Sequence, residues 1–404
     1  MIQTPKSLTL HIGIFGRTNV GKSTLVNYIT DQKTSIVSSI PGTTTDSVFK
    51  TMELLPIGPV TFIDTAGLDD KSVLAKERIE KTKHIFNMAD VAVIVAEPNV
   101  WTEHESNIIA ELSKKNTPAM VVVNNYKNIK LNSEFVEQIS KFKYQESALL
   151  QGHRDNFLNE FKKHILDIAP DEIFNNIPLT DKIIKEFQTV ILVVPIDLGA
   201  PKGRIILPQV QMIRAILDIN AIAIIVKDSE LQKCLDNLKN PPDIVICDSQ
   251  VVKKVAGIVP QNIKLTTFSI VFSANRANIS AMLEGVKKIK ELKPGDKILI
   301  AEACTHHASS DDIGRIKIPN WIKKHLGFDV QFDVFAGHNY PKNIKDYALV
   351  IHCGGCMINK KQMISRQNYA LENNIPITNY GLLISFVNGE FERVTAPFKN
   401  ITSK

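Results

Sequence analysis

Short uninterrupted runs of apolar residues recur along the chain and alternate with stretches whose apolar residues have helical spacing. Runs of this kind are typical of strands that are buried on both faces, as in a parallel sheet covered by helices. We therefore predict an α/β fold. Strands are expected at 8–15, 60–63, 119–123, 187–194, 221–226, 243–247, 297–303, 328–335 and 347–352. Helices are expected at 205–218, 230–240, 279–292, 313–325 and 359–372.

The first apolar run leads directly into Gly16-Arg-Thr-Asn-Val-Gly-Lys-Ser23. This G-x-x-x-x-G-K-S pattern between a strand and an amphipathic helix is that of a phosphate-binding loop. Backbone N–H groups and the helix N-terminus are expected to bind the phosphates, with Lys22 at the β- and γ-phosphates and Ser23 at Mg²⁺. The nucleotide-binding residues predicted from this stretch are Gly16, Asn19, Val20, Gly21, Lys22, Ser23 and Thr24.

Two further segments are typical of a GTPase. The segment Pro41–Asp46 resembles the first switch of translation-factor-related GTPases, in which Thr44 would contact the γ-phosphate and Mg²⁺. Asp64-Thr-Ala-Gly67 follows an apolar run, so Asp64 is expected to act on Mg²⁺ through its bound waters and the Gly67 N–H to meet the γ-phosphate. Loss of that phosphate is expected to release both segments.

Leu68 stands where Ras-like GTPases carry a glutamine that positions water. Because an apolar side chain cannot orient water, slow intrinsic hydrolysis is expected. Asn19 matches the asparagine of GTPases that use a monovalent cation, so we predict stimulation by K⁺; the alternative is that Asn19 only caps the loop. The residues expected to act in catalysis are Lys22, Asn19, Thr44 and Asp64.

The base-reading segment departs from the usual N-K-x-D pattern. The run 119–123 leads to Asn124, which fits, but Asn125 stands in place of the lysine and Lys127 in place of the aspartate. Loss of the carboxylate that pairs with guanine costs on the order of a few kcal/mol, so weakened affinity or selectivity for GTP is expected. The residues that match the last guanine-side loop are Ser147 and Ala148.

The stretch 187–247 alternates strand-like and helix-like segments and carries little catalytic chemistry. A small α/β module without a chemical motif often serves assembly. We expect this part of the chain to mediate dimerisation, with a plain structural domain as the alternative.

Three cysteines lie at the ends of two predicted strands. His352-Cys-Gly-Gly-Cys356 follows the run 347–351, and Cys304 ends the run 297–303. If these strands are neighbours in one parallel sheet, their carboxyl ends lie at the same edge, where α/β folds bind ligands. The two glycines allow a tight turn, so the three sulfurs would converge.

Three thiolates with nearby imidazoles are typical of two kinds of metal site. A closed zinc site would need a fourth ligand such as His306, whereas a [4Fe–4S] cluster would keep one exchangeable position. A redox pair or a coincidence is the alternative for an isolated C-x-x-C. Adjacent strand residues face opposite ways, which favours His306 over His352. The candidate metal ligands are Cys304, Cys353, Cys356, His306 and His352, with Ser23 and Thr44 at Mg²⁺.

Composition narrows the functional classes. The net charge of +6 is diffuse, without a run of five or six basic residues, so no nucleic-acid partner is expected. Five scattered cysteines argue against a disulfide framework. No apolar run has transmembrane length and Met1–Ser7 lacks a signal-peptide core, so we expect a cytoplasmic protein without a membrane partner.

Taken together, these motifs resemble the HydF family of GTPases, which help to assemble the active site of [FeFe]-hydrogenase. The resemblance covers nearly the full length. It is carried by the phosphate-binding loop, by Pro195-Ile-Asp197, Ala200–Arg204 and Leu207–Val210, and by Cys304-x-His306 with His352-Cys-Gly-Gly-Cys356. It implies a P-loop GTPase domain with a doubly wound sheet at 1–170, a dimerisation domain at 180–265 and a [4Fe–4S]-binding domain at 266–404.

The resemblance also implies a function: a GTP-binding iron–sulfur scaffold or carrier for the di-iron precursor, which hydrolyses GTP with Mg²⁺ and K⁺. It implies a homodimer that works with two radical-SAM maturases and apo-[FeFe]-hydrogenase. The cluster ligands it implies are Cys304, Cys353 and Cys356, with His306 and His352 as auxiliary ligands.

Two other functions are weighed against this one. An RNA-modification or ribosome-assembly GTPase with a zinc site would need a basic RNA-binding face, and an electron-transfer module would be expected to supply four cysteine ligands.

Overall fold

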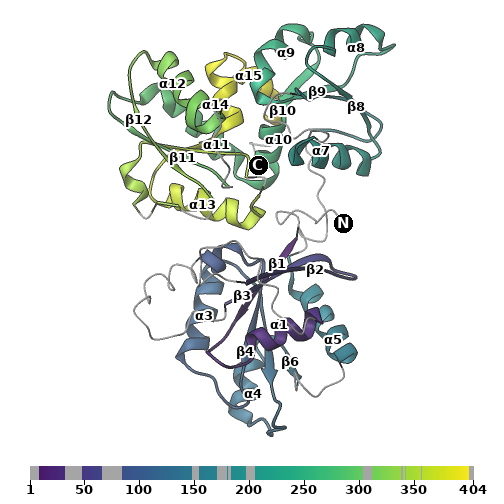
Figure 1. Ribbon diagram of the computed structural model, residues 1–404, viewed down its shortest axis with the longest axis vertical. Coiled ribbons are helices and arrows are strands. Elements are labelled where there is room, and N and C mark those ends of the chain that lie inside the picture. Colours follow the sequence, from purple (N-terminus) through teal and green to yellow (C-terminus); the bar gives the residue numbers. More distant parts are fainter. Residues whose placement is uncertain are drawn as a thin grey trace. The chain divides into compact units, whose positions relative to one another are not determined.

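The computed structural model describes residues 9–31, 48–65, 84–147, 154–170, 180, 183–196, 205–303, 312–337, 340–341, 343–355 and 357–399. They belong to two compact units, Met1–Asn176 and Ile177–Lys404 (Figure 1). The first unit holds one six-stranded sheet and the second holds two four-stranded parallel sheets, so the chain has the three α/β domains that the sequence predicts. Within the described ranges, no helix is long and apolar enough to cross a membrane.

The sheet of the first unit has the strand order β2-β3-β1-β4-β5-β6, with β2 antiparallel to β3 and the other pairs parallel. Its strands are β1 (Leu10–Phe15), β2 (Val48–Leu54), β3 (Gly58–Asp64), β4 (Val91–Ala96), β5 (Ala119–Asn124) and β6 (Lys143–Ser147). The helices around it are α1 (Lys22–Thr30), α3 (Glu103–Lys114), α4 (Ser133–Ile139) and α5 (Arg154–Ile168).

Helices cover both faces of this sheet (Figure 1). Along β4, Val93 packs in a cluster with residues of α1 and α5, whereas its neighbour Ile94 packs with residues of α3. Successive side chains of a strand point to opposite faces, so a strand covered on both sides must be apolar throughout. This explains the uninterrupted apolar run and confirms the predicted doubly wound sheet.

The second unit contains two parallel sheets, with the strand orders β10-β9-β7-β8 and β12-β11-β13-β14. The elements of the first are β7 (Thr189–Val193), α7 (Leu207–Asp218), β8 (Ile222–Val226), α8 (Leu231–Asn237), β9 (Ile244–Cys247), α9 (Val252–Ile258), β10 (Lys264–Thr267) and α10 (Phe268–Arg276). The elements of the second are α11 (Ile279–Lys287), β11 (Lys297–Ala301), α12 (Ile318–Leu326), β12 (Gln331–Phe335), β13 (Leu349–His352), α13 (Lys360–Glu372), β14 (Ile377–Asn379), α14 (Tyr380–Val387) and α15 (Phe391–Thr395).

A single hydrophobic core joins the two sheets of the second unit. It contains Val190 of β7 and Ile298 of β11, together with Phe272 of α10 and Leu383 of α14. Cys247 is also fully buried in this core, and burial raises the pKa of its thiol. The two domains of this unit are therefore stabilised by shared apolar burial.

The packing of α11 on β14 gives a test of this core. An added Cβ at Gly285 in α11 would overlap the carbonyl oxygen of Ile377, whereas one at Gly257 in α9 would meet nothing. We expect Gly285→Ala to destabilise the second unit by about 1–3 kcal/mol, because the backbones must move apart. Gly257→Ala, the matched control, is expected to stabilise it by up to ~1 kcal/mol through helix propensity. Urea unfolding measures both, and equal midpoints for the two variants would contradict this packing.

Candidate functional site

The phosphate-binding loop lies between β1 and α1, as the sequence predicts. Gly16 has a φ of +137°, and a Cβ there would overlap the carbonyl oxygen of Val95 in β4. Gly21 has a φ of 104° and directly precedes the first turn of α1. Both positions therefore require glycine, and they direct the loop backbone and the N-terminus of α1 toward one site for anionic phosphates.

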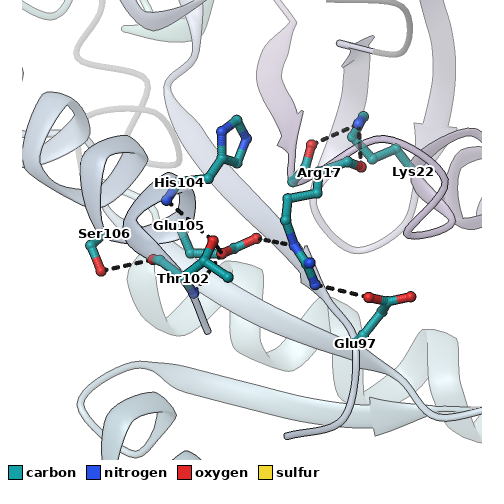
Figure 2. A network of polar contacts seen from close by, with 8 residues as sticks. Arg17, Lys22, Glu97, Thr102, His104, Glu105 and Ser106 are labelled. Carbon is teal, nitrogen blue, oxygen red and sulfur yellow. Dashed lines mark hydrogen bonds and ion pairs between the residues drawn. The ribbon is translucent and has the colours of Figure 1, made fainter. Parts of the chain in front are cut away.

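Three of the residues predicted to act at the phosphates and Mg²⁺, namely Lys22, Ser23 and Asp64, lie at this loop. Lys22 is buried, and its Nζ donates to the carbonyl oxygens of Gly16 at 2.6 Å and Arg17 at 2.8 Å (Figure 2). The Ser23 hydroxyl donates to the Asp64 carboxylate at 2.6 Å. The hydroxyl lies in the first turn of α1 and the carboxylate at the end of β3. Both are oxygen donors of the kind that Mg²⁺ prefers.

An ion-pair network that the sequence analysis did not identify holds the loop from the side (Figure 2). The Arg17 guanidinium lies 3.0 Å from a carboxylate oxygen of Glu105 and 2.8 Å from one of Glu97. Glu105 is fully buried and also accepts hydrogen bonds from the backbone N–H and the hydroxyl of Thr102, the N-cap of α3. Arg17 therefore ties the phosphate-binding loop to the start of α3.

The charge of Glu105 is maintained by these contacts. Burial alone would disfavour its ionised form, but the hydrogen bonds from Thr102 and the charge of Arg17 outweigh burial and keep the pKa of Glu105 below its ordinary value. Arg17 occupies a variable position of the loop motif, and its partner lies 88 residues away in the chain. No local pattern could have identified the pair.

The predicted base-reading residues also lie together. Asn124 ends β5 and is buried, and its amide donates to the carbonyl oxygen of Val20 in the phosphate-binding loop at 3.0 Å. The backbone N–H of Asn125 donates to the carbonyl oxygen of Ser147, the last residue of β6, at 2.8 Å. Residues from β5, β6 and the loop thus form one surface beside the phosphate site.

The two substituted positions of the base-reading segment have different roles. The Asn125 side chain accepts from the backbone N–H of Ile129 at 2.8 Å and donates to the carbonyl oxygen of the same residue at 2.7 Å, so it closes the turn. Lys127 is exposed, with its ammonium 5.4 Å from the centre of the Tyr126 ring. The described segment 124–133 contains no carboxylate, so a cation stands where the guanine-binding acceptor is expected.

Several predicted residues lie outside the described ranges: Thr44, Gly67, Leu68, Ala148, Cys304, His306 and Cys356. Their assigned roles stay predictions. Within the described residues, no group of three His, Cys, Asp or Glu side chains is arranged to hold a metal ion.

The two strands that precede the cysteines are neighbours. β11 and β13 pair in parallel, with Ala301 opposite His352, so the condition for bringing the cysteines to one edge is met. The Cys353 N–H donates to the Ala301 carbonyl oxygen at 2.9 Å, and the Ala303 N–H donates to Cys353 Sγ at 3.1 Å. The main chain that follows β11 therefore contacts the sulfur that follows β13.

His352 is fully buried beside this sulfur, and both of its ring nitrogens are engaged. Nδ1 lies 2.7 Å from the carbonyl oxygen of Cys353, and Nε2 lies 3.1 Å from a guanidinium nitrogen of Arg366 in α13. Burial and the charge of Arg366 lower the pKa of His352 to about 3, so its imidazole is neutral. In this arrangement Nδ1 carries the proton and Nε2 accepts from Arg366. His352 thus orders the strand end, and its role as an iron ligand stays a prediction.

Three parts of the chain match known domain families. Residues 11–125 match the model of the 50S ribosome-binding GTPase family. Residues 179–277 match the hydrogen maturase F dimerization domain, and residues 280–397 match the hydrogen maturase F tetramerization domain. The last two domains imply that the chain forms homo-oligomers.

Individual relatives cover less of the chain. The tRNA modification GTPase MnmE of Prochlorococcus marinus (strain NATL1A) is 34% identical over 178 residues, which are 40% of this chain and 38% of that protein. The GTPase Der of Kosmotoga olearia is 30% identical over 199 residues, 48% of this chain and 41% of that protein. The chain thus spans about two fifths of the length of these curated relatives.

Among solved structures, the G domain of the T. maritima FeoB iron transporter is similar, with 20% identity and a TM-score of 0.31 over 39% of this chain and 98% of that one. The two hydrogen maturase F domains follow a P-loop GTPase domain and together account for nearly all of residues 179–397. The chain belongs to the hydrogen maturase F family of GTPases.

Proposed function

We propose that this chain is a GTP-binding scaffold or carrier that holds a [4Fe–4S] cluster and serves in assembly of the di-iron centre of [FeFe]-hydrogenase. The hydrogen bond from the Ala303 N–H to Cys353 Sγ carries the proposal. Cys304 follows Ala303 directly, and consecutive Cα atoms are about 3.8 Å apart. Two of the three proposed cysteine ligands therefore belong to chain segments that touch at the carboxyl edge of β11 and β13.

The donor set fits such a cluster better than a fully closed site. Cys304, Cys353 and Cys356 would supply three thiolates, and His306 or His352 would be auxiliary ligands. Both ring nitrogens of His352 are already engaged, and this favours His306 as the proposed imidazole ligand. When bound, a cluster with three cysteine ligands offers one exchangeable iron position for the di-iron precursor.

The nucleotide site is proposed to hydrolyse GTP with Mg²⁺ held by Ser23 and Thr44, and with K⁺ at Asn19. The contact between Ser23 and Asp64 supports the Mg²⁺ assignment. The proposed domains are the GTPase domain at 1–170, the dimerisation domain at 180–265 and the cluster-binding domain at 266–404. By family resemblance, the partners are two radical-SAM maturases, apo-[FeFe]-hydrogenase and further copies of this chain in a homodimer or larger homo-oligomer.

Anaerobic reconstitution tests the cluster. The chain is expected to bind about four iron and four sulfide and to give an EPR signal on reduction. Cys304→Ala, Cys353→Ala and Cys356→Ala are each expected to lose most of the iron, because three thiolates are the minimum set. Cys234→Ala in α8 of the same unit is the control and is expected to retain it. Zinc without a reducible cluster, or full iron binding by Cys304→Ala, would overturn the proposal.

The proposed K⁺ site predicts cation-dependent hydrolysis. GTP turnover is expected to be several-fold faster in KCl than in NaCl, and Asn19→Ala is expected to abolish the difference because its side-chain oxygen would be lost. Thr18→Ala changes the exposed neighbour in the same loop and is expected to keep the stimulation. The rate of phosphate release in each salt measures the stimulation. If Asn19→Ala is still stimulated by K⁺, Asn19 does not bind the cation and only caps the loop.

The base-reading segment predicts weak selection for the 2-amino group of guanine. Lys127→Asp is expected to increase the affinity for GTP about 10–100-fold relative to inosine triphosphate, which lacks that group, because a carboxylate acceptor contributes ~1.5–3 kcal/mol. Lys130→Asp makes the same charge change nearby and is the control. Competition binding with both nucleotides measures the ratio, and strong preference for GTP in the unaltered chain would refute this reading of the site.

A further inference from the structure

A buried arginine at the cysteine-bearing edge has no part in the functions described so far. Arg366 lies on α13, the helix that begins shortly after Cys356, and it is only 6% exposed. The exposed charged face of a helix is the usual place for arginine, so a deeply buried guanidinium needs a partner that offsets its charge.

The contacts of Arg366 hold two strand ends together. One guanidinium nitrogen donates to the Glu302 carbonyl oxygen at 3.4 Å and to His352 Nε2 at 3.1 Å. Glu302 directly follows β11 and stands two residues before Cys304, while His352 ends β13 and directly precedes Cys353. The second nitrogen donates to the carbonyl oxygen of Gly337, beyond the end of β12. Arg366 thus connects the ends of three neighbouring strands.

None of these contacts neutralises the guanidinium. Its acceptors are two carbonyl oxygens and a ring nitrogen of His352, none of which is anionic. The centre of the Tyr340 ring lies 5.3 Å from the guanidinium carbon. The nearby Glu302 carboxylate is engaged with Arg315 at 3.3 Å and accepts from the Tyr380 hydroxyl at 3.5 Å. In the part of the chain that the structure describes, no carboxylate forms an ion pair with Arg366.

The anionic groups that could offset the charge of Arg366 are the cysteine thiolates of the proposed cluster site. Cys353 directly follows His352, whose Nε2 lies 3.1 Å from a guanidinium nitrogen of Arg366. An uncompensated buried cation is costly on its own, but it becomes favourable when negative charge is placed beside it. A cluster bound by three thiolates brings such charge to this edge.

We propose that Arg366 is the positioning residue and internal counter-cation of the cluster site, and this rests on the proposed function. Its planar fork holds the strand ends that precede Cys304 and Cys353, and its charge offsets that of the thiolate-bound cluster. Reduction adds an electron to the cluster, so the nearby cation favours the reduced state and raises the reduction potential.

The test compares three variants of the reconstituted full chain by potentiometric titration and by the rate of iron loss to a chelator. Arg366→Gln is expected to shift the potential to a more negative value and to release iron faster. Arg366→Lys keeps the charge without the bidentate fork, so it is expected to restore the potential but not the slow release. Lys324→Gln removes an exposed charge on α12 of the same unit and is the control; both readouts are expected to stay near those of the unaltered chain.

The outcomes separate this inference from the function on which it rests. If the unaltered chain forms no reducible cluster, both fail. If it forms one and Arg366→Gln has the same potential and iron release as Lys324→Gln, only the role of Arg366 is overturned. Circular dichroism reports whether each variant folds; should Arg366→Gln not fold, Arg366→Lys decides, and iron release as slow as in the unaltered chain would refute the positioning role.

Discussion

The parallel pairing of β11 with β13 is the constraint on which the cysteine site depends. This pairing places Ala301 opposite His352. The segments that follow the two strands then lie in contact, because the Ala303 N–H donates to the sulfur of Cys353, 50 residues away in the chain. Chain entropy opposes such a long-range contact, and the burial of both strands in the sheet offsets it. Without this pairing the cysteines would be unrelated residues on separate loops.

The same architectural rule positions both sites of the chain. In the first unit, Lys22, Asp64 and Asn124 lie at or just beyond the carboxyl ends of parallel strands, and in the second unit Cys353 does. Open parallel sheets bind ligands at this edge because helices cover the faces and loops are free to carry chemistry. The nucleotide site and the edge that carries Cys353 thus arise from one type of fold with different residues after the strands.

Much of the fold follows from local sequence. Strands such as β1, β5 and β13 are uninterrupted apolar runs because both of their faces are covered, and the phosphate-binding loop is fixed by a motif whose glycines have few alternatives. The strands β2, β4, β6, β10 and β14 were not predicted. β10 (Lys-Leu-Thr-Thr) and β14 (Ile-Thr-Asn) contain no uninterrupted apolar run. Their pairing is set by the neighbouring strand rather than by their own sequence.

The supporting residues of both sites could not be found in this way. Arg17 and Arg366 look like ordinary basic residues in a loop and on a helix, and only tertiary packing shows that one holds a buried glutamate and the other lies buried between strand ends. Their roles depend on contacts across the chain, whereas the cysteines and the lysine of the loop are recognised by spacing alone.

The most direct measurement of the central claim is the location of iron in a crystal of the reconstituted chain, found by anomalous scattering at the iron edge. The account predicts one cluster bonded to the sulfurs of Cys304, Cys353 and Cys356 at the carboxyl edge of β11 and β13. Iron bound elsewhere, or a Cys304 sulfur that points away from the metal, would contradict it.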